Sequence, residues 1–161
     1  SIKTIEDQNA LWDALISDKI DVIATDHAPH TFNEKNQLYV DCPSGGPLVQ
    51  HSLYIMYEHF LEKRISLEKI VEKMCHNPAL LFNIKKRGFI REGFFADLVI
   101  LRKNQSWVIN KNNILYKCGW SPFEGKKINS MITHTFVSGN LAYENGVFNQ
   151  NIMGKKIEFN S

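Results

Sequence analysis

The sequence predicts an α/β fold, with helices and one buried strand in residues 1–87 and mainly strands in residues 88–161. Three observations carry this prediction. An amphipathic helix leads through a short link into an apolar, β-branched run, which is half of a repeating βα pattern. Later segments carry apolar residues at helical spacing. Beyond Gly88 short β-type runs alternate with Gly and Asn turns, so we expect two domains, residues 1–87 and residues 88–161.

The first helix and strand deliver a group of polar side chains. Thr4 caps the helix, and the run 21–25 reads as a short strand buried on both faces. Asp26, His27 and His30 follow directly after that strand. In parallel α/β folds ligands bind in the crevice beyond the carboxyl ends of the strands. We therefore expect a functional site at this turn.

A loop and a helix come next. Residues 32–47 are polar, contain Gly and Pro, and are too irregular for a helix or a paired strand, so we interpret them as an active-site loop. A helix is predicted from Pro47 to Lys63. Its apolar side carries Val49, Leu53, Met56, Phe60 and Leu61.

Two further helices follow, capped by Ser66 and by Asn77 with Pro78. His51 and His59 lie eight positions apart on the preceding helix, which is too far for one metal ion, so packing or solvent exposure explains them better. His76 lies at a helix junction, where we expect a structural role.

The last part of the chain is predicted to form strands over residues 96–101, 107–109 and 132–137. Ser138-Gly139 and Asn145-Gly146 predict two tight hairpins, because Gly and Asn accept the positive φ of primed turns. A three-stranded meander should therefore close the chain.

Composition excludes several classes of protein. The net charge is +2, and the dense basic spots at Lys85–Arg87 and Lys126–Lys127 are small, so we expect no nucleic-acid partner. Cys42, Cys75 and Cys118 lack metal-type spacing and cannot all pair in one molecule, which favours a reduced, cytoplasmic protein. No apolar run approaches the roughly 20 residues of a membrane span, so no membrane partner is expected.

Length is informative too. A complete (β/α)8 barrel needs about 250 residues, and this chain has 161. We therefore interpret it as a piece of a longer protein that exposes apolar surface, with homodimerisation or self-association as an expected outcome.

The run DVIATDHAPHT closely resembles the last metal-site segment of dihydroorotases, the zinc cyclic amidohydrolases of pyrimidine biosynthesis in the amidohydrolase superfamily. The resemblance continues through PSGGP, NPA and ADLVI. It implies the C-terminal portion of a (β/α)8 TIM-barrel amidohydrolase, followed by part of a small β-sandwich. It also implies a small-molecule substrate, since the parent enzyme would interconvert L-dihydroorotate and N-carbamoyl-L-aspartate. The implied cofactor is zinc, in a binuclear site whose HxH pair, lysine bridge and further histidines would lie upstream.

By this resemblance Asp26 is both a metal ligand and the catalytic proton shuttle, and His30 contacts the substrate. The residue types suit these roles, because a carboxylate can move a proton and an imidazole can bond a carbonyl or a carboxylate. The simpler alternatives are an Asp that caps the turn and a His that ties down the loop. His27 is expected to have a supporting role at most.

The substrate-binding assignment extends to Pro43, Ser44 and Gly45, where relatives offer backbone groups to the substrate ring. Glycine permits close approach of the backbone to a ligand, although an ordinary loop turn explains the same residues. Cys42 has no histidine partner of a known pattern, and we treat it as inert.

Two other functions stay open. Pro29 and His30 disfavour hydantoinase or allantoinase chemistry, because these two residues resemble the dihydroorotase motif and the related enzymes usually carry other residues there. A non-catalytic scaffolding subunit is disfavoured by the presence of Asp26 and His30. The chain alone is expected to be inactive, because a catalytic zinc needs about three protein ligands.

Overall fold

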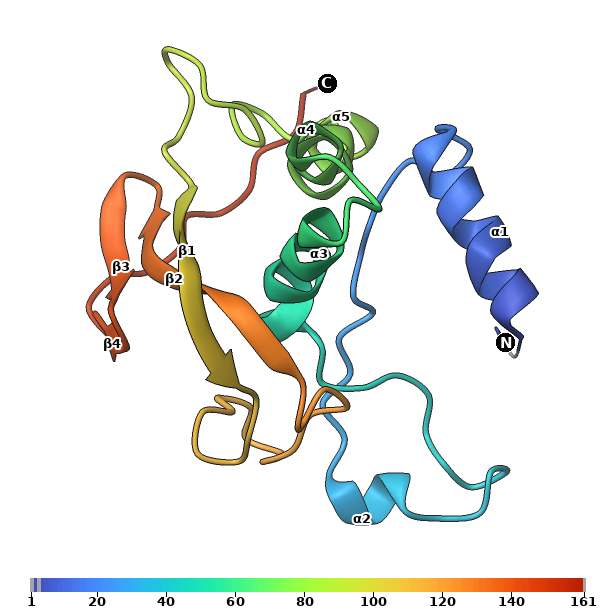
Figure 1. The fold of residues 1–161 in the computed structure, drawn as a ribbon. Coiled ribbons are helices and arrows are strands. Elements are labelled where there is room, and N and C mark those ends of the chain that lie inside the picture. The colour runs from blue at the N-terminus through green and yellow to red at the C-terminus, as the bar shows by residue number, and fades with distance from the viewer. Residues whose placement is uncertain (1, 3, 161) are drawn as a thin grey trace.

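A computed structural model describes residue 2 and residues 4–160, and it places an antiparallel sheet on one side, helix α1 on the other and helices α3 to α5 between them (Figure 1). The helical elements are α1 (Ile5–Ile16), α2 (Phe32–Lys35), a 3-10 turn η1 (Val49–His51), α3 (Ser52–Leu61), α4 (Leu67–Val71), a π-helical segment η2 (Glu72–His76) and α5 (Asn77–Leu81). The strands are β1 (Leu98–Val108), β2 (Lys127–Val137), β3 (Asn140–Glu144) and β4 (Val147–Phe148). None of the described helices is long and apolar enough to cross a membrane.

Helix α1 begins as the sequence predicts. The Thr4 hydroxyl accepts the amide of Asp7 and the Asp7 carboxylate accepts the amide of Thr4, each at 3.1 Å, which forms a capping box. After the helix, Asp18 adopts a φ of 62° and pairs with Lys69 at 2.7 Å and with Lys73 at 2.9 Å. Hydrogen bonds from Lys69 and then Lys73 lower the pKa of Asp18 to about 2. This ion-pair cluster fixes the turn into the motif segment.

The predicted strand over residues 21–25 is wrong for this chain. The segment is extended, but the structure assigns it no strand pairing, and Val22 and Ile23 are only half-buried. It is held instead by the helices: the Ile23 amide donates to the Lys73 carbonyl at 3.0 Å, and the Asn77 side chain donates to the Asp21 carbonyl at 2.7 Å. A strand buried on both faces needs parallel neighbours, and the described strands belong to one antiparallel sheet elsewhere.

The loop over residues 32–47 contains a helix that the sequence interpretation excluded. One turn, α2, begins after Thr31, whose hydroxyl accepts the Glu34 amide at 3.3 Å while Glu34 accepts the Thr31 amide at 2.7 Å. This second capping box stabilises a helix too short to show apolar periodicity.

Helix α3 packs on both sides, which the predicted one-sided pattern missed. Its Leu53, Met56 and Phe60 join a core with Leu15 of α1 and Ile70 of α4, as their spacing predicts. Val49 and Leu61, predicted on the same side, are exposed. The helix begins at Ser52 after a 3-10 turn, later than the predicted start at Pro47.

The opposite side of α3 faces the sheet. Tyr54 lies in a second core with Ile109 and Ile128. One helical turn further along α3, the buried Glu58 carboxylate accepts hydrogen bonds from the Asn129 backbone N–H at 2.7 Å and from the Asn129 side-chain amide at 2.8 Å. Tyr54 and Glu58 are four residues apart and so lie on one face of the helix, which joins the helical layer to strand β2.

Ser66 caps α4 as predicted, with its hydroxyl accepting the Lys69 amide at 3.1 Å. Asn77 does not act as a helix cap. It has helical φ and ψ angles inside an unbroken run from α4 through η2 to α5, so the predicted stop before Asn77 is wrong. Pro78 lies at the second position of α5 and does not end the helical run before it. A proline lacks a backbone N–H, and this is tolerated here because the preceding segment η2 has a π-helical hydrogen-bond pattern.

The sheet has strand order β1-β2-β3-β4, all antiparallel. Two predicted strands merge into the single strand β1, which continues past register shifts against β2. Both hairpins are confirmed: Ser138 and Gly139 have φ of 52° and 87°, and Asn145 and Gly146 have φ of 44° and 96°. In the described part of the chain this is one sheet, so a β-sandwich is not confirmed.

Candidate active site

The Asp26–His30 turn lies at the end of the molecule near α2, away from α4 and α5 (Figure 1). Asp26 has a φ of 45° and its side chain is exposed. A positive φ is costly for any residue with a Cβ, and such strain is concentrated at functional sites where the surroundings impose it. The chain therefore holds this carboxylate in a conformation that its own backbone preference does not favour.

The Pro43–Pro47 segment supplies those surroundings. His27 and Gly46 form a parallel β-bridge, and the Ala28 amide donates to the Gly46 carbonyl at 3.0 Å. Gly45 has a φ of 80°, and a Cβ there would lie 2.6 Å from the Ala28 Cβ and 3.3 Å from the Asp26 carbonyl oxygen. Only glycine fits so close an approach. The structure thus brings together the two segments that the sequence predicts to form the site.

The backbone of the Pro43–Gly46 turn is partly used by its own loop. The Pro43 carbonyl accepts the Lys35 ammonium at 2.6 Å and lies 3.6 Å from the Cys42 thiol. Ser44 is exposed beside it. Since Pro43 is engaged by α2, Ser44 and Gly45 offer the freer backbone groups. Cys42 is half-buried and its thiol also donates to the Lys35 carbonyl at 3.5 Å, contacts typical of packing.

His27 is tied to the start of the following helical turn. Its Nδ1 accepts the amides of Leu48 at 3.1 Å and Val49 at 3.3 Å. A ring nitrogen that accepts hydrogen bonds carries no proton, so the neutral ring is protonated on Nε2. Its ring lies against Tyr116, with centroids 5.3 Å apart. These contacts match the supporting role expected for His27.

His30 is fixed through its backbone. Its amide donates to the Ala28 carbonyl at 2.9 Å, and its carbonyl accepts the indole N–H of Trp120 at 2.8 Å. Trp120 also packs edge-on against Phe32, with ring centroids 6.3 Å apart. His30 as a whole residue is half-buried.

The sequence interpretation missed the β1–β2 loop, residues 110–126, which lies against the motif. Gln50 clamps it: the side-chain amide donates to the Asn113 carbonyl at 2.8 Å, and its oxygen accepts the Leu115 amide at 2.9 Å. The Tyr116 hydroxyl in turn accepts a hydrogen bond from the backbone N–H of Gln50 at 2.8 Å. Burial raises the pKa of Tyr116. An aromatic-rich connection between strands was the one sequence signal that could have pointed to this loop.

His51 anchors the same loop from the end of η1, directly before α3. Its side chain is fully buried, and its Nδ1 lies 3.2 Å from the Ser121 hydroxyl and 3.4 Å from the Tyr116 hydroxyl. Nε2 has no hydrogen-bond partner among the described residues. Burial lowers the pKa of His51, so the ring is held neutral. A packing role, as the sequence predicts, fits these contacts.

His59 and His76 are also accounted for by packing. His59 lies 2.9 Å from Glu62 and packs on Trp12, with ring centroids 4.8 Å apart. His76 stacks on Phe89 with centroids 4.3 Å apart, consistent with a structural role.

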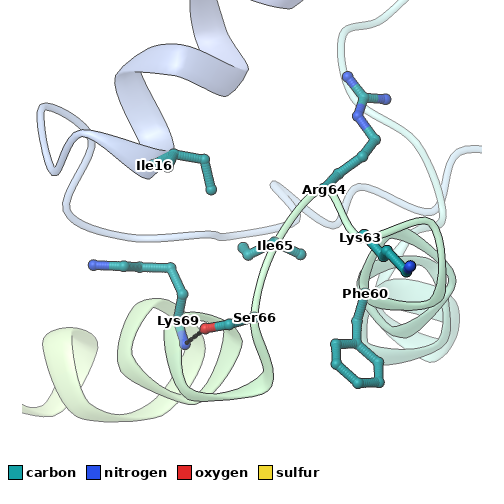
Figure 2. Close-up of a pocket in the computed structure, with 7 residues that line it drawn as sticks. All are labelled: Ile16, Phe60, Lys63, Arg64, Ile65, Ser66 and Lys69. Atoms are coloured by element: carbon teal, nitrogen blue, oxygen red, sulfur yellow. Dashed lines mark hydrogen bonds between the residues drawn. The ribbon is translucent and has the colours of Figure 1, made fainter.

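Two openings in the described structure lie elsewhere. A pocket of about 410 Å³ lies where the end of α1 meets the α3–α4 turn (Figure 2). Ile16, Phe60 and Ile65 contribute to its wall. The side chains of Arg64 and Lys69 extend in different directions in Figure 2, and each has its own partner, the Trp12 ring or Asp18. These charges do not converge on a ligand.

A larger hollow of about 740 Å³ lies over the sheet and includes Tyr54, Trp107 and Tyr143 in its wall. It contains none of the predicted site residues. The candidate site is therefore the open turn around Asp26, at the surface of the described chain.

Metal binding can be tested against these residues. Amidohydrolases generally depend on a metal ion, but the described residues contain no group of three or more His, Cys, Asp and Glu side chains that could hold one. Asp26 is exposed and able to supply one ligand, while His27 Nδ1 is occupied by two amides. The described residues do not by themselves fit a complete metal site.

Comparison with known proteins identifies the family. The family model described as "Amidohydrolase family" matches residues 3–142. The chain is 38% identical over 143 residues to "Multifunctional protein pyr1-3" of Dictyostelium discoideum, covering 89% of this chain and 6% of that protein. It is 36% identical over 140 residues to "Dihydroorotase" of Endomicrobium trichonymphae, covering 86% of this chain and 33% of that protein.

Solved structures agree on the fold. The structure of "L-Hydantoinase (Dihydropyrimidinase) from Arthrobacter aurescens" superposes with a TM-score of 0.82 at 29% identity, covering 90% of this chain and 33% of that one. The chain thus spans about a third of the length of this structure and of the Endomicrobium relative. The family match covers most of the chain, and the chain belongs to the amidohydrolase family.

Proposed function

We propose that the full-length protein carrying this chain is a dihydroorotase, a metal-dependent enzyme that reversibly hydrolyses L-dihydroorotate to N-carbamoyl-L-aspartate in pyrimidine biosynthesis. The observation that carries the proposal is that Asp26, exposed and at a positive φ, lies against the Gly45 turn. The similarity to relatives named dihydroorotase supports this choice of substrate.

The proposal places residues 1–87 in the C-terminal portion of a (β/α)8 barrel and residues 88–161 in part of a small β-sandwich. It names zinc as the metal, with Asp26 as one ligand and the remaining ligands outside this chain. The extended, half-buried segment over residues 21–25 supports the barrel assignment, because it has the shape of a strand without neighbours.

The chemistry assigned to this chain is proton transfer. Hydrolysis of the cyclic amide forms a bond between a water oxygen and the ring carbonyl carbon and breaks the bond from that carbon to the ring nitrogen. Asp26 accepts the proton of the attacking water and delivers it to the departing nitrogen, and ring closure runs the same transfers in reverse. An exposed carboxylate fixed by its backbone can reach both atoms without reorganising.

His30 and the Pro43–Gly45 turn are assigned to substrate binding. The His30 imidazole can bond a substrate carbonyl or carboxylate in either protonation state. Ser44 and Gly45 lie beside the Asp26 turn, where their backbone groups can meet a ring at close range.

Hydantoinase activity is a second candidate, because solved hydantoinases share the fold at TM-scores near 0.82. Comparing turnover of dihydroorotate with that of hydantoin and allantoin separates these activities. A non-catalytic scaffolding subunit would turn over none of them and would lack bound metal.

The decisive test replaces Asp26 and His30 separately in the full-length protein. Asp26→Asn removes proton transfer while preserving shape, and we expect at least an approximately 100-fold loss of turnover. Activity of this variant within about tenfold of the wild type would contradict the assignment. His30→Ala should raise the Michaelis constant more than it lowers zinc content, and stoichiometric loss of zinc would show that His30 binds metal instead.

A further inference from the structure

The β1–β2 loop, residues 110–126, reaches the candidate site from the other side of the molecule. Two aromatic residues make the contacts: the Trp120 indole N–H donates to the His30 carbonyl at 2.8 Å, and the Tyr116 ring lies against His27. Trp120 and His30 are 90 positions apart in the sequence. A segment of the sheet layer therefore fixes the turn that carries the candidate catalytic residues.

The contact is built to be rigid. Gln50 pairs with two backbone groups of the loop, and the buried His51 lies 3.2 Å from the Ser121 hydroxyl, next to Trp120 in the sequence. Ser121 is itself buried, and its hydroxyl accepts the Phe123 amide at 3.2 Å. The base of the loop thus cannot shift without breaking several hydrogen bonds at the start of α3.

At the far end of the turn the other described restraint is local, the capping box of Thr31 and Glu34 that begins α2. Asp26, His27 and Pro29 are exposed, and the Gly46 bridge reaches only as far as Ala28. Beyond Ala28 the backbone of His30 has one bond within the turn and one bond to Trp120. The Trp120 indole N–H therefore fixes the His30 backbone from outside the turn. The position of that backbone in turn sets the point from which the imidazole extends.

We infer that Trp120 is a positioning residue of the substrate site, whose indole N–H fixes His30 for contact with the cyclic amide substrate. The effect on catalysis rests on the proposed function, whereas the effect on the turn does not. Loss of one hydrogen bond should change substrate affinity by about two- to tenfold.

The test compares Trp120→Phe with a matched control, Trp107→Phe, in the full-length protein. Trp107 also donates its indole N–H to a backbone carbonyl, that of Ser130 at 2.7 Å, and its ring lies near Tyr54 and His51, neither of which belongs to the Asp26–His30 turn. Both substitutions keep an aromatic ring and remove one N–H. Trp120→Phe should raise the Michaelis constant about two- to tenfold with turnover within about twofold, and Trp107→Phe should leave the Michaelis constant unchanged.

A double mutant distinguishes positioning from a general loss of structure. In a His30→Ala background, Trp120→Phe should have no further effect on the Michaelis constant, because the group that it positions is gone. Additive effects, an unchanged Michaelis constant in Trp120→Phe, or an equal rise in Trp107→Phe would each overturn the inference.

Amide hydrogen exchange provides a readout that needs no substrate. Trp120→Phe should speed exchange in a peptide covering residues 26–31, and Trp107→Phe should not. Unchanged exchange in Trp120→Phe would overturn the inference whatever the enzyme acts on. Absence of dihydroorotate turnover in the wild type would instead contradict the proposed function, and the exchange comparison would still decide the role of Trp120.

Discussion

At the scale of single residues, the site depends on one glycine. Gly45 allows its backbone to lie against Ala28 and the Asp26 carbonyl, and its φ of 80° is in the region that L side chains rarely adopt. The neighbouring Gly46 has open space around the position that a Cβ would occupy. The two glycines therefore have different tolerances for a methyl group, although they are adjacent in the sequence.

Gly45→Ala should destabilise the turn and displace Asp26. The left-handed backbone conformation alone costs about 1–2 kcal/mol for alanine, and the 2.6 Å approach to Ala28 adds to it. We expect a lower melting temperature and at least about a tenfold loss of turnover. Gly46→Ala is the matched control and should behave nearly as the wild type. Equal stability and activity of the two variants would show that the close approach is not needed.

At the scale of secondary-structure elements, His51 joins the end of η1 to the β1–β2 loop. The ring is buried, its Nε2 lacks a described partner, and burial lowers its pKa. The unfolded state regains an ordinary histidine pKa of 6.5 and binds a proton below that pH, while the folded state resists protonation. Folding should therefore weaken as the pH falls below about 6.5.

The expected result is a lower urea midpoint at pH 5.5 than at pH 7.5, as followed by tryptophan fluorescence. His51→Asn keeps a polar atom near Ser121 and removes the titrating ring, so its midpoints at the two pH values should lie closer together. His59→Asn is the control, because the described contacts of His59 are with Glu62 and Trp12 and not with the β1–β2 loop. It should retain the loss seen in the wild type. A His51→Asn variant with the full wild-type difference would exclude His51 as the cause.

Local elements could be predicted from the sequence because their determinants are local. Thr4, Ser66 and the Ser138-Gly139 and Asn145-Gly146 turns act within about four residues, and the structure confirms each of them. The Asn77 prediction is wrong because Asn77 has helical φ and ψ inside a continuous helical run, whereas a capping residue has non-helical φ and ψ. Its side-chain N–H donates to the Asp21 carbonyl 56 positions away, a contact that the local sequence does not reveal.

The site shows the same division. Asp26, His30 and Gly45 could be named from the motif, and the contact between their two segments agrees with that prediction. Trp120 and Tyr116 could not be placed, since their partners lie in another layer and no periodicity relates them. The composition of residues 21–25 predicts a paired strand. Pairing depends on neighbouring strands, and the described chain does not provide them beside this run.

At the scale of the whole molecule, much apolar surface remains uncovered. Leu38, Tyr39 and Val40 at the tip of the loop are at least 76% exposed, and Ile90 is 89% exposed. Soluble monomers rarely leave such groups open together, so these surfaces are suited to contact with other protein segments. In the longer relatives, two thirds of the chain lies outside the matched region.

The 161 residues on their own should therefore bind no catalytic zinc and hydrolyse no dihydroorotate. The described residues hold no three-ligand group, and Asp26 cannot take a proton from a nucleophile that is not bound and oriented. The exposed apolar surfaces and the unpaired run over residues 21–25 should also make the isolated chain self-associate.

The measurement is to purify these residues with excess zinc and carbonate, then determine bound metal, dihydroorotate hydrolysis and molecular mass by light scattering. Asp26→Asn made in the same chain is the control for metal bound at the candidate site. A tightly held binuclear zinc centre with turnover of about one per second would contradict the expectation, because that is an ordinary enzyme rate. The chain could instead bind zinc tightly without turnover and lose that zinc in Asp26→Asn. This result would mark the Asp26–His30 turn as a metal-binding module, since Asp26, His27 and His30 are the side chains of that turn that are able to bind a metal ion.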